Sequence, residues 1–218
     1  EWFLYIFFLI IITIFIVFTI IFERQQVIKR EENRLSTQVK IVNDNILMQI
    51  YSVNEAFKNI KIVIDKKNDL ISNLKLFVNV IPSVRTFLIM DKNGNVTASS
   101  RDDLTTFNYS SRDYFKIVKN NPVENKLFIS SPYISVLGTL NINIATPFFD
   151  ENKNFAGIIL AAFDPDALSN LLTSVIYADD MKASIIHGDG TLFLTVPTNS
   201  LLVGKKLLDS QSLLSKHI

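Results

Sequence analysis

The sequence contains no cysteine, and only two of its 218 residues are histidine, His187 and His217. Without cysteine the chain can form neither a disulfide framework nor a cysteine-based zinc site. No cluster of metal-ligand type surrounds either histidine, and no Ser/His/Asp or paired-carboxylate constellation stands out. The sequence therefore predicts no catalytic residues, no metal and no cofactor, so that this segment is not itself an enzyme.

An excess of charge of one sign is also lacking. The 22 Lys and Arg residues nearly balance the 21 Asp and Glu residues, which leaves a formal net charge of +1. Proteins that bind nucleic acid depend on a basic surface to neutralise phosphates, and this composition gives no sign of one. We therefore expect no nucleic-acid partner.

Glycine and proline are absent from the N-terminus up to Pro82, and the first part of this stretch is almost wholly apolar. The run Trp2–Phe22 carries no charge, and 17 of its 21 residues are Leu, Ile, Val or Phe. As a helix it would span roughly 32 Å, enough to cross a hydrocarbon core of about 30 Å. The alternatives are a cleaved signal peptide or a buried core helix. A signal peptide has a shorter apolar run that ends in small residues, whereas this run ends in Phe22-Glu23-Arg24. We therefore predict an uncleaved transmembrane helix over residues 1–22, in the plasma (inner) membrane.

A long amphipathic helix is predicted to follow over residues 23–82, together with a connecting helix. Apolar residues recur every three or four positions, the pattern of a helix with coiled-coil character. This heptad face comprises Leu35, Val39, Val42, Ile46, Ile50, Val53, Phe57, Ile60 and Ile64. The C-terminal part of the helix could pack on its own domain or form a dimer stalk. For residues 23–50 nothing nearby in sequence offers cover, so we predict a homodimer there. Leu70–Val80 is a second helix, which Pro82 ends.

Strand patterns begin after Pro82. Val84–Asp91 and Val96–Ser100 flank an Asn-Gly turn and predict a β-hairpin. Further strands are predicted at Lys126–Ser130, Thr139–Phe149 and Phe155–Asp164, the last of them apolar and central. A second hairpin is predicted from Ala183–His187 and Thr191–Val196, with a turn around Gly190.

Two helix starts are signalled between these strands. The run Ser110-Ser111-Arg112-Asp113 fits a capping box that opens a helix to Asn120. Asp164 before Pro165 fits an N-cap followed by proline in the first turn, opening a helix to about Ile176. The two hairpins share one plan, and their glycines, Gly94 and Gly190, are 96 residues apart. This repeat predicts two similar α/β lobes in tandem, the second incomplete.

The segments FLIMDKNGNVTASSR, SSRDYF, LFISSPYIS, INIATPFFDENKNFAGIILAAFDPDAL, IIHGDGTLF and VGKKL follow the long helix in this order. In order and spacing the chain resembles the extracytoplasmic double Cache (PAS-like) sensor domains of bacterial receptors, above all those fused to GGDEF diguanylate cyclases and histidine kinases. The resemblance implies an α/β (α+β) fold with antiparallel sheets. A membrane-distal ligand-binding lobe would occupy residues 83–176, and a truncated membrane-proximal lobe residues 177–218. It also implies a further membrane helix beyond residue 218, in a longer protein.

Members of this family that bind amino acids carry an aromatic residue, an Arg-x-aromatic-aromatic run and a later Asp. The matching positions here are Phe107, the run from Arg112 through Tyr114 to Phe115, and Asp164. Arg112 would hold a carboxylate with its planar donor fork, and Asp164 an ammonium group. From the residues alone, Arg112 could equally be a first-turn helix residue, Asp164 a helix cap, and the two aromatic residues core.

The sequence also departs from the family pattern. Phe107 and Phe115 stand where a tyrosine hydroxyl is expected, and Tyr114 where Trp is common. Near Tyr133, the sixth predicted site residue, Ser135 replaces an acid. The resemblance therefore implies a small carboxylate ligand, with simple or dicarboxylic acids favoured over amino acids.

We accordingly expect a membrane-anchored, periplasmic or extracellular sensor that carries a ligand signal across the membrane. A full-length signalling enzyme, a chemoreceptor and an envelope protein that binds no small molecule remain the alternatives.

Overall fold

The computed structural model describes residues 2–64, 67–135, 138, 140–199 and 201–207. Within these ranges the chain forms two compact units, residues 1–45 and 46–218. The division falls inside one continuous helix, α1, which runs from Trp2 to Val63. A second helix, α2, spans Lys67–Val80 and ends before Pro82, as the sequence predicts.

The first unit consists of helix alone. It carries the apolar run Trp2–Phe22, the one segment in the described chain that is long and apolar enough to cross a membrane. None of the residues in this run is buried, because no other part of the unit packs on it. The heptad-face residues of this unit, Leu35, Val39 and Val42, are likewise exposed or half-buried.

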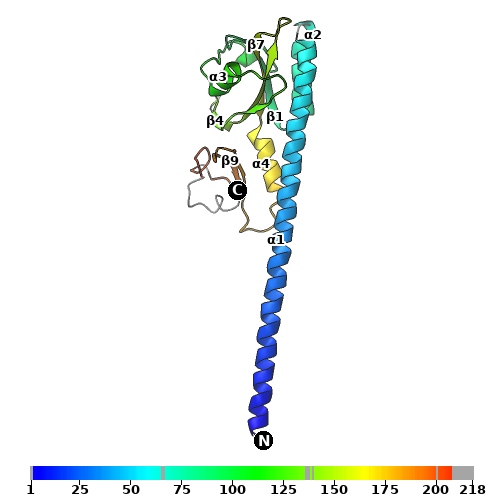
Figure 1. The fold of residues 1–218 in the computed structure, drawn as a ribbon, viewed down its shortest axis with the longest axis vertical. Coiled ribbons are helices and arrows are strands. Elements are labelled where there is room, and N and C mark those ends of the chain that lie inside the picture. The colour runs from blue at the N-terminus through cyan, green and yellow to red at the C-terminus, as the bar shows by residue number, and fades with distance from the viewer. Residues whose placement is uncertain (1, 65–66, 136–137, 139, 200, 208–218) are drawn as a thin grey trace. The chain divides into compact units, whose positions relative to one another are not determined.

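The second unit is built on a five-stranded antiparallel sheet with the order β2-β1-β7-β6-β3 (Figure 1). The strands are β1 Val84–Asp91, β2 Val96–Ser99, β3 Phe128–Ile129, β6 Asn143–Phe149 and β7 Phe155–Phe163. Strand β7 is central, as its apolar sequence predicts, and is almost wholly buried. Two further ribbons pair β4 Tyr133–Ile134 with β5 Leu140–Asn141, and β8 Ala183–Ile186 with β9 Leu192–Val196.

Side chains on the two faces of this sheet enter two separate cores, because successive strand residues point to opposite sides. On one face, Phe87, Ile89 and Ile159 share a core with residues from the last turns of α1 and from α2. On the other face, Leu88 and Leu160 pack against α3, Asp113–Asn120. The sheet is therefore a wall between a helix-facing core and an α3-facing core.

The heptad-face residues of this unit belong to the helix-facing core. Val53, Phe57 and Ile60 are fully buried there, and Ile46 and Ile50 pack against its edge. The C-terminal part of the long helix thus packs on its own domain, the first of the two alternatives that its pattern allowed.

Both predicted hairpins form, with matching turns. The amide of Gly94 donates to the carbonyl of Asp91, and the amide of Gly190 donates to the carbonyl of His187. Both glycines have positive φ, +82° and +88°, which side-chain-bearing residues rarely adopt. The second lobe itself stays a prediction, because β8–β9 belongs to the same compact unit as the five-stranded sheet. Residues 208–218, which the prediction assigned to that lobe, lie outside the described residues.

Two predicted elements differ in the structure by more than the position of their ends. The strand expected over Thr139–Phe149 is divided into β5 and β6, which pair with β4 and with β3 respectively. The opposing segment contains Pro132, which has no amide hydrogen to continue one ladder. The capping box at Ser110 does not form: α3 begins after Arg112, without a side-chain cap, and the Ser110 hydroxyl donates to Asn108 instead.

Helix α4, Pro165–Thr173, begins as predicted, with Asp164 as its N-cap and Pro165 in its first turn. The Asp164 carboxylate accepts a hydrogen bond from the amide of Asp166 at 3.0 Å. The helix ends at Thr173, three residues before the predicted end, and its buried leucines, Leu168 and Leu172, face inward.

Candidate functional site

A small cavity of about 30 Å³, lined by both apolar and polar residues, lies between the sheet and α3. Its walls come from β1, β7, the β4–β5 ribbon, the start of β6 and the N-terminus of α3. The described residues that line it are Arg85, Thr86, Leu88, Leu104, Tyr109, Arg112, Tyr114, Tyr133, Ser135, Asn141, Asn143, Leu160 and Ala162. The leucines and alanine form an apolar floor, and every charged lining residue in this described set is an arginine.

Arg112 is placed by the start of α3. Its backbone is extended, with φ −74° and ψ 140°, and its carbonyl accepts from the amides of Phe115 and Lys116 in the first helical turn. The guanidinium carbon lies 5.1 Å from the centre of the Tyr133 ring, which is cation–π geometry. This stacking holds the guanidinium at the cavity wall.

Tyr114 and Tyr133 form the aromatic part of the wall, with ring centres 5.7 Å apart. Burial raises the pKa of the Tyr114 hydroxyl far above its usual range. Burial also raises the pKa of Tyr133 and of Tyr109, against the opposing charge of Arg112. The three phenols therefore stay protonated at physiological pH, and each keeps a hydroxyl hydrogen that it can donate.

Two asparagines and a second arginine complete the cavity. Arg85 donates from Nη2 to Oδ1 of Asn141 at 2.5 Å, which ties β1 to β5. Asn143 donates from Nδ2 to the Tyr133 hydroxyl at 2.6 Å. With two guanidinium groups and several neutral donors, the cavity is suited to an anion such as a carboxylate.

The structure brings three of the six predicted site residues together at this cavity: Arg112, Tyr114 and Tyr133. The other three lie elsewhere. Phe107 is 38% exposed and packs against the ring of Tyr109, and Phe115 is buried in the α3-facing core against Phe155. The Asp164 carboxylate caps α4.

Sequence reasoning missed Arg85, Tyr109, Asn141 and Asn143. Arg85 is the one charged residue before the final Asp in the strand VRTFLIMD, a signal that a polar group faces inward. The two asparagines alternate in NIN, which places them on one side of an extended chain. Polar residues that interrupt buried strands could therefore have pointed to the site.

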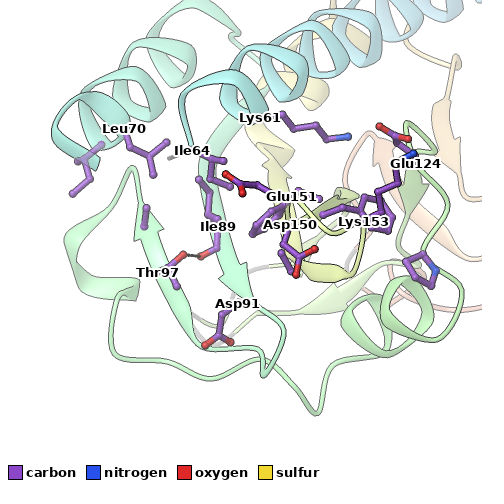
Figure 2. Close-up of a pocket in the computed structure, with 16 residues that line it drawn as sticks. Lys61, Ile64, Leu70, Ile89, Asp91, Thr97, Glu124, Asp150, Glu151 and Lys153 are labelled. Atoms are coloured by element: carbon purple, nitrogen blue, oxygen red, sulfur yellow. Dashed lines mark hydrogen bonds between the residues drawn. The ribbon is translucent and has the colours of Figure 1, made fainter. Parts of the chain in front are cut away.

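A larger cleft, of about 1290 Å³, opens on the helix-facing side of the sheet (Figure 2). Figure 2 shows Lys61 extending from α1 towards Glu124 at its rim. The carboxylates of Asp91 and Asp150 are used by their own turns, where they accept from Asn95 and Asn154 respectively. Two carboxylates of this cleft thus serve local structure, whereas the polar residues that line the smaller cavity come from five different elements.

The small cavity is linked to the β8–β9 hairpin by one further contact. Ser131, two residues before Tyr133, donates to Oδ2 of Asp189 at 2.7 Å. Asp189 also accepts from the amide of Thr191 and lies 2.9 Å from Nδ1 of His187. These bonds, led by that from Ser131, hold the pKa of Asp189 well below its usual range. The hairpin turn is therefore attached to the chain segment that carries Tyr133.

The profile of the Cache domain, in its double Cache form, matches residues 23–214. The chain belongs to the Cache domain family. It is therefore a sensor domain of the extracytoplasmic, ligand-binding class found in bacterial receptors, with one N-terminal apolar helix, and the Cache domain is non-catalytic in itself. No curated protein matches the sequence.

Solved structures share the fold. The extracellular domain of a putative histidine kinase, rpHK1S-Z16, has a TM-score of 0.61 at 18% identity, over 82% of this chain and 79% of that chain. The ligand-binding domain of the Pseudomonas fluorescens chemoreceptor CtaA, in complex with L-isoleucine, has a TM-score of 0.57 at 20% identity, over 77% and 68%. An extracellular ligand binding receptor from Desulfohalobium retbaense has a TM-score of 0.56 at 15% identity. The match covers 74% of this chain but only 32% of the receptor, so the chain spans about a third of that protein.

Proposed function

We propose that this chain is the ligand-sensing region of a membrane-bound bacterial receptor and that it binds a small carboxylate metabolite in the cavity beside α3. The observation that carries the proposal is Arg112, stacked on Tyr133 at a cavity whose charged lining, among the described residues, is cationic. The carboxylate would pair with the Arg112 guanidinium and accept from the neighbouring phenols.

The residues that line the cavity argue against a typical amino acid as the ligand. An ammonium group would need a carboxylate or several acceptors, and the described lining contains no Asp or Glu. Asp164, the expected acceptor, is used as the cap of α4. The second arginine, Arg85, favours instead a simple or dicarboxylic acid, in contrast to the isoleucine bound by the P. fluorescens domain.

Ligand entry would require movement of the cavity wall, since about 30 Å³ holds water but not a carboxylic acid. Each strand of the β4–β5 ribbon is two residues long, and β4 carries Tyr133. Its displacement by a ligand would pull on Ser131 and hence on Asp189 in the β8–β9 hairpin. A ligand that binds the open arrangement better would shift the population towards it, which is what sensing requires.

The signal would leave the sensor along α1. We propose that residues 2–22 span the inner membrane, that the sensor faces the periplasm or exterior, and that residues 23–45 pair with a second copy. An exposed apolar helix of this length and a heptad face without cover in its unit support this arrangement. A kinase, a diguanylate cyclase or a chemoreceptor output would follow in the full-length protein, and the sequence of its gene beyond residue 218 would decide among them.

A screen of small acids against the full chain in detergent micelles tests the proposed ligand site. A ligand at a hundred times its dissociation constant should stabilise the folded state by about 2.7 kcal/mol, a melting shift of roughly 5–11 °C. Arg112→Ala should weaken the binding of that ligand at least about tenfold, because the carboxylate loses its charged partner.

Arg101→Ala provides the matched control. Arg101 also lies in the loop region before α3, but its guanidinium pairs with Asp103 at 2.7 Å and does not line the cavity. It should leave affinity unchanged. If Arg112→Ala lowered the melting temperature of the ligand-free chain and left affinity unaltered, Arg112 would be structural and the proposal would be wrong.

A further inference from the structure

Asn143 is buried and has a polar atom without a partner. Its side chain is 1% exposed and lines the cavity at the start of β6. Its backbone amide donates to Ser130 Oγ at 2.9 Å, its carbonyl accepts from the Ser130 amide at 2.8 Å, and Nδ2 donates to Tyr133. Oδ1 has no hydrogen-bond partner among the described residues. Buried acceptors are normally paired, so an orphan at a binding cavity needs an explanation.

The neighbouring Asn141 provides a comparison, because its amide oxygen has a hydrogen-bond partner within the protein. It too is buried, at 5% exposure, and lines the same cavity. Its Oδ1 accepts from Arg85. Of two asparagines separated by one residue, one therefore has its acceptor occupied by the protein, and the other leaves its buried acceptor without a partner on a residue that lines the cavity.

We propose that Asn143 makes the sensor selective for hydroxycarboxylates. The inference rests on the proposed carboxylate site: with the carboxylate on Arg112, a hydroxyl group on the same ligand donates to Oδ1 of Asn143 and satisfies it. A site built to pair with a ligand group discriminates against analogues that lack this group, because its own polar atom stays buried and unpaired. An ammonium donor is disfavoured by Arg85 and Arg112, which line the same small cavity.

The test uses two series of acids on the unmodified full chain in detergent micelles, followed by isothermal titration calorimetry. One series is lactate, propionate and pyruvate; the other is malate, succinate and oxaloacetate. In each, one carbon skeleton carries a hydroxyl donor, no polar substituent, or an oxo acceptor. In the series that fits the cavity, the hydroxy acid should bind at least about tenfold more tightly than the unsubstituted acid. The oxo acid should bind weakest, since two acceptors would face each other.

Variants separate the amide from its surroundings. Asn143→Leu keeps a side chain of similar shape without the amide, so the hydroxy and unsubstituted acids should then bind equally. Tyr133→Phe removes the hydroxyl that accepts the hydrogen bond from Nδ2 of Asn143. It leaves Oδ1 of Asn143 in place, so the preference for the hydroxy acid should persist. Should Asn143→Leu fail to fold, the three-acid order in the unmodified chain still decides the question.

The outcomes distinguish this inference from the proposed function. Equal binding of hydroxy and unsubstituted acids, still abolished by Arg112→Ala, would overturn selection by Asn143 and leave the carboxylate site standing. Tightest binding of the oxo acid would mean that the amide nitrogen faces the ligand, and this would overturn the inference. Alanine and aspartate, added to the two series as their amino analogues, test for an amino-acid site, and tightest binding of either would also overturn the inference. Failure of every acid to bind would overturn both.

Discussion

The two halves of helix α1 carry the same periodic pattern of apolar residues and have different surroundings. In residues 2–45 the heptad-face side chains are exposed or half-buried, and the unit has no core. In Ile46–Val63 the same pattern supplies Val53, Phe57 and Ile60 to the centre of a packed domain. Periodicity thus predicts that a helix forms and which face is buried, but it does not identify what covers that face. The cover comes from distant segments, here β1, β6 and β7.

The largest expected difference between the two halves concerns stability. Phe57 is 1% exposed and packs edge-to-face against Phe87, with ring centres 6.1 Å apart. Phe57→Ala should lower the free energy of unfolding of the second unit by about 3–5 kcal/mol, because it removes apolar contacts and leaves a cavity. Denaturant unfolding in detergent micelles, followed by circular dichroism, measures this.

Leu35→Ala is the control in the first half, since Leu35 is 44% exposed and lies outside the second unit. It should leave the unfolding of that unit unchanged. Equal destabilisation by the two substitutions would show that the halves do not differ as described.

The proposed dimer concerns the exposed half and can be tested by cross-linking, which the absence of native cysteine simplifies. Single cysteines at Leu35, Val39 and Val42 should form disulfide-linked dimers under mild oxidation, since facing positions of a parallel coiled coil lie close together. A cysteine at Lys40, off the heptad face, should cross-link several-fold less. Similar yields at all four positions would argue against pairing through this face.

How far the fold was predictable follows from which interactions are local. The hairpins, the central strand β7 and the N-cap at Asp164 depend on turn residues and short patterns, and the structure confirms them. The division between β5 and β6 was missed, because it depends on Pro132 in a partner segment. The failed cap at Ser110 depends on competition from Asn108.

The candidate site was predictable only in part, for the same reason. The motif around Arg112 is contiguous, so the sequence shows it, and the structure places Arg112, Tyr114 and Tyr133 at one cavity. Arg85 and Asn143 reach this cavity from strands 58 residues apart in sequence, and only the sheet order brings them together. Phe115 follows Tyr114 on α3, roughly 100° further round the helix, and its ring packs against Phe155 instead of lining the cavity.

The smallest effect that we expect is on the pH dependence of stability, and it is tested by substituting two lysines, one in each half of α1. Lys61 is half-buried, and its ammonium makes long hydrogen bonds to described residues, at 3.4 Å to Asn125 and 3.5 Å to Thr146. Burial lowers its pKa from the ordinary value of 10.5, against the charge of Glu124. Between the folded pKa and 10.5 the unfolded chain binds more protons, so stability should rise with pH through this window. Lys61→Met should abolish this rise and increase the melting temperature at pH 7 by a few degrees, because an uncharged chain of similar length avoids the desolvation.

Lys40→Met, at an exposed position of the first half, is the control and should change neither the pH dependence nor the melting temperature. A melting temperature lowered by Lys61→Met would show instead that the ammonium stabilises the fold through Glu124.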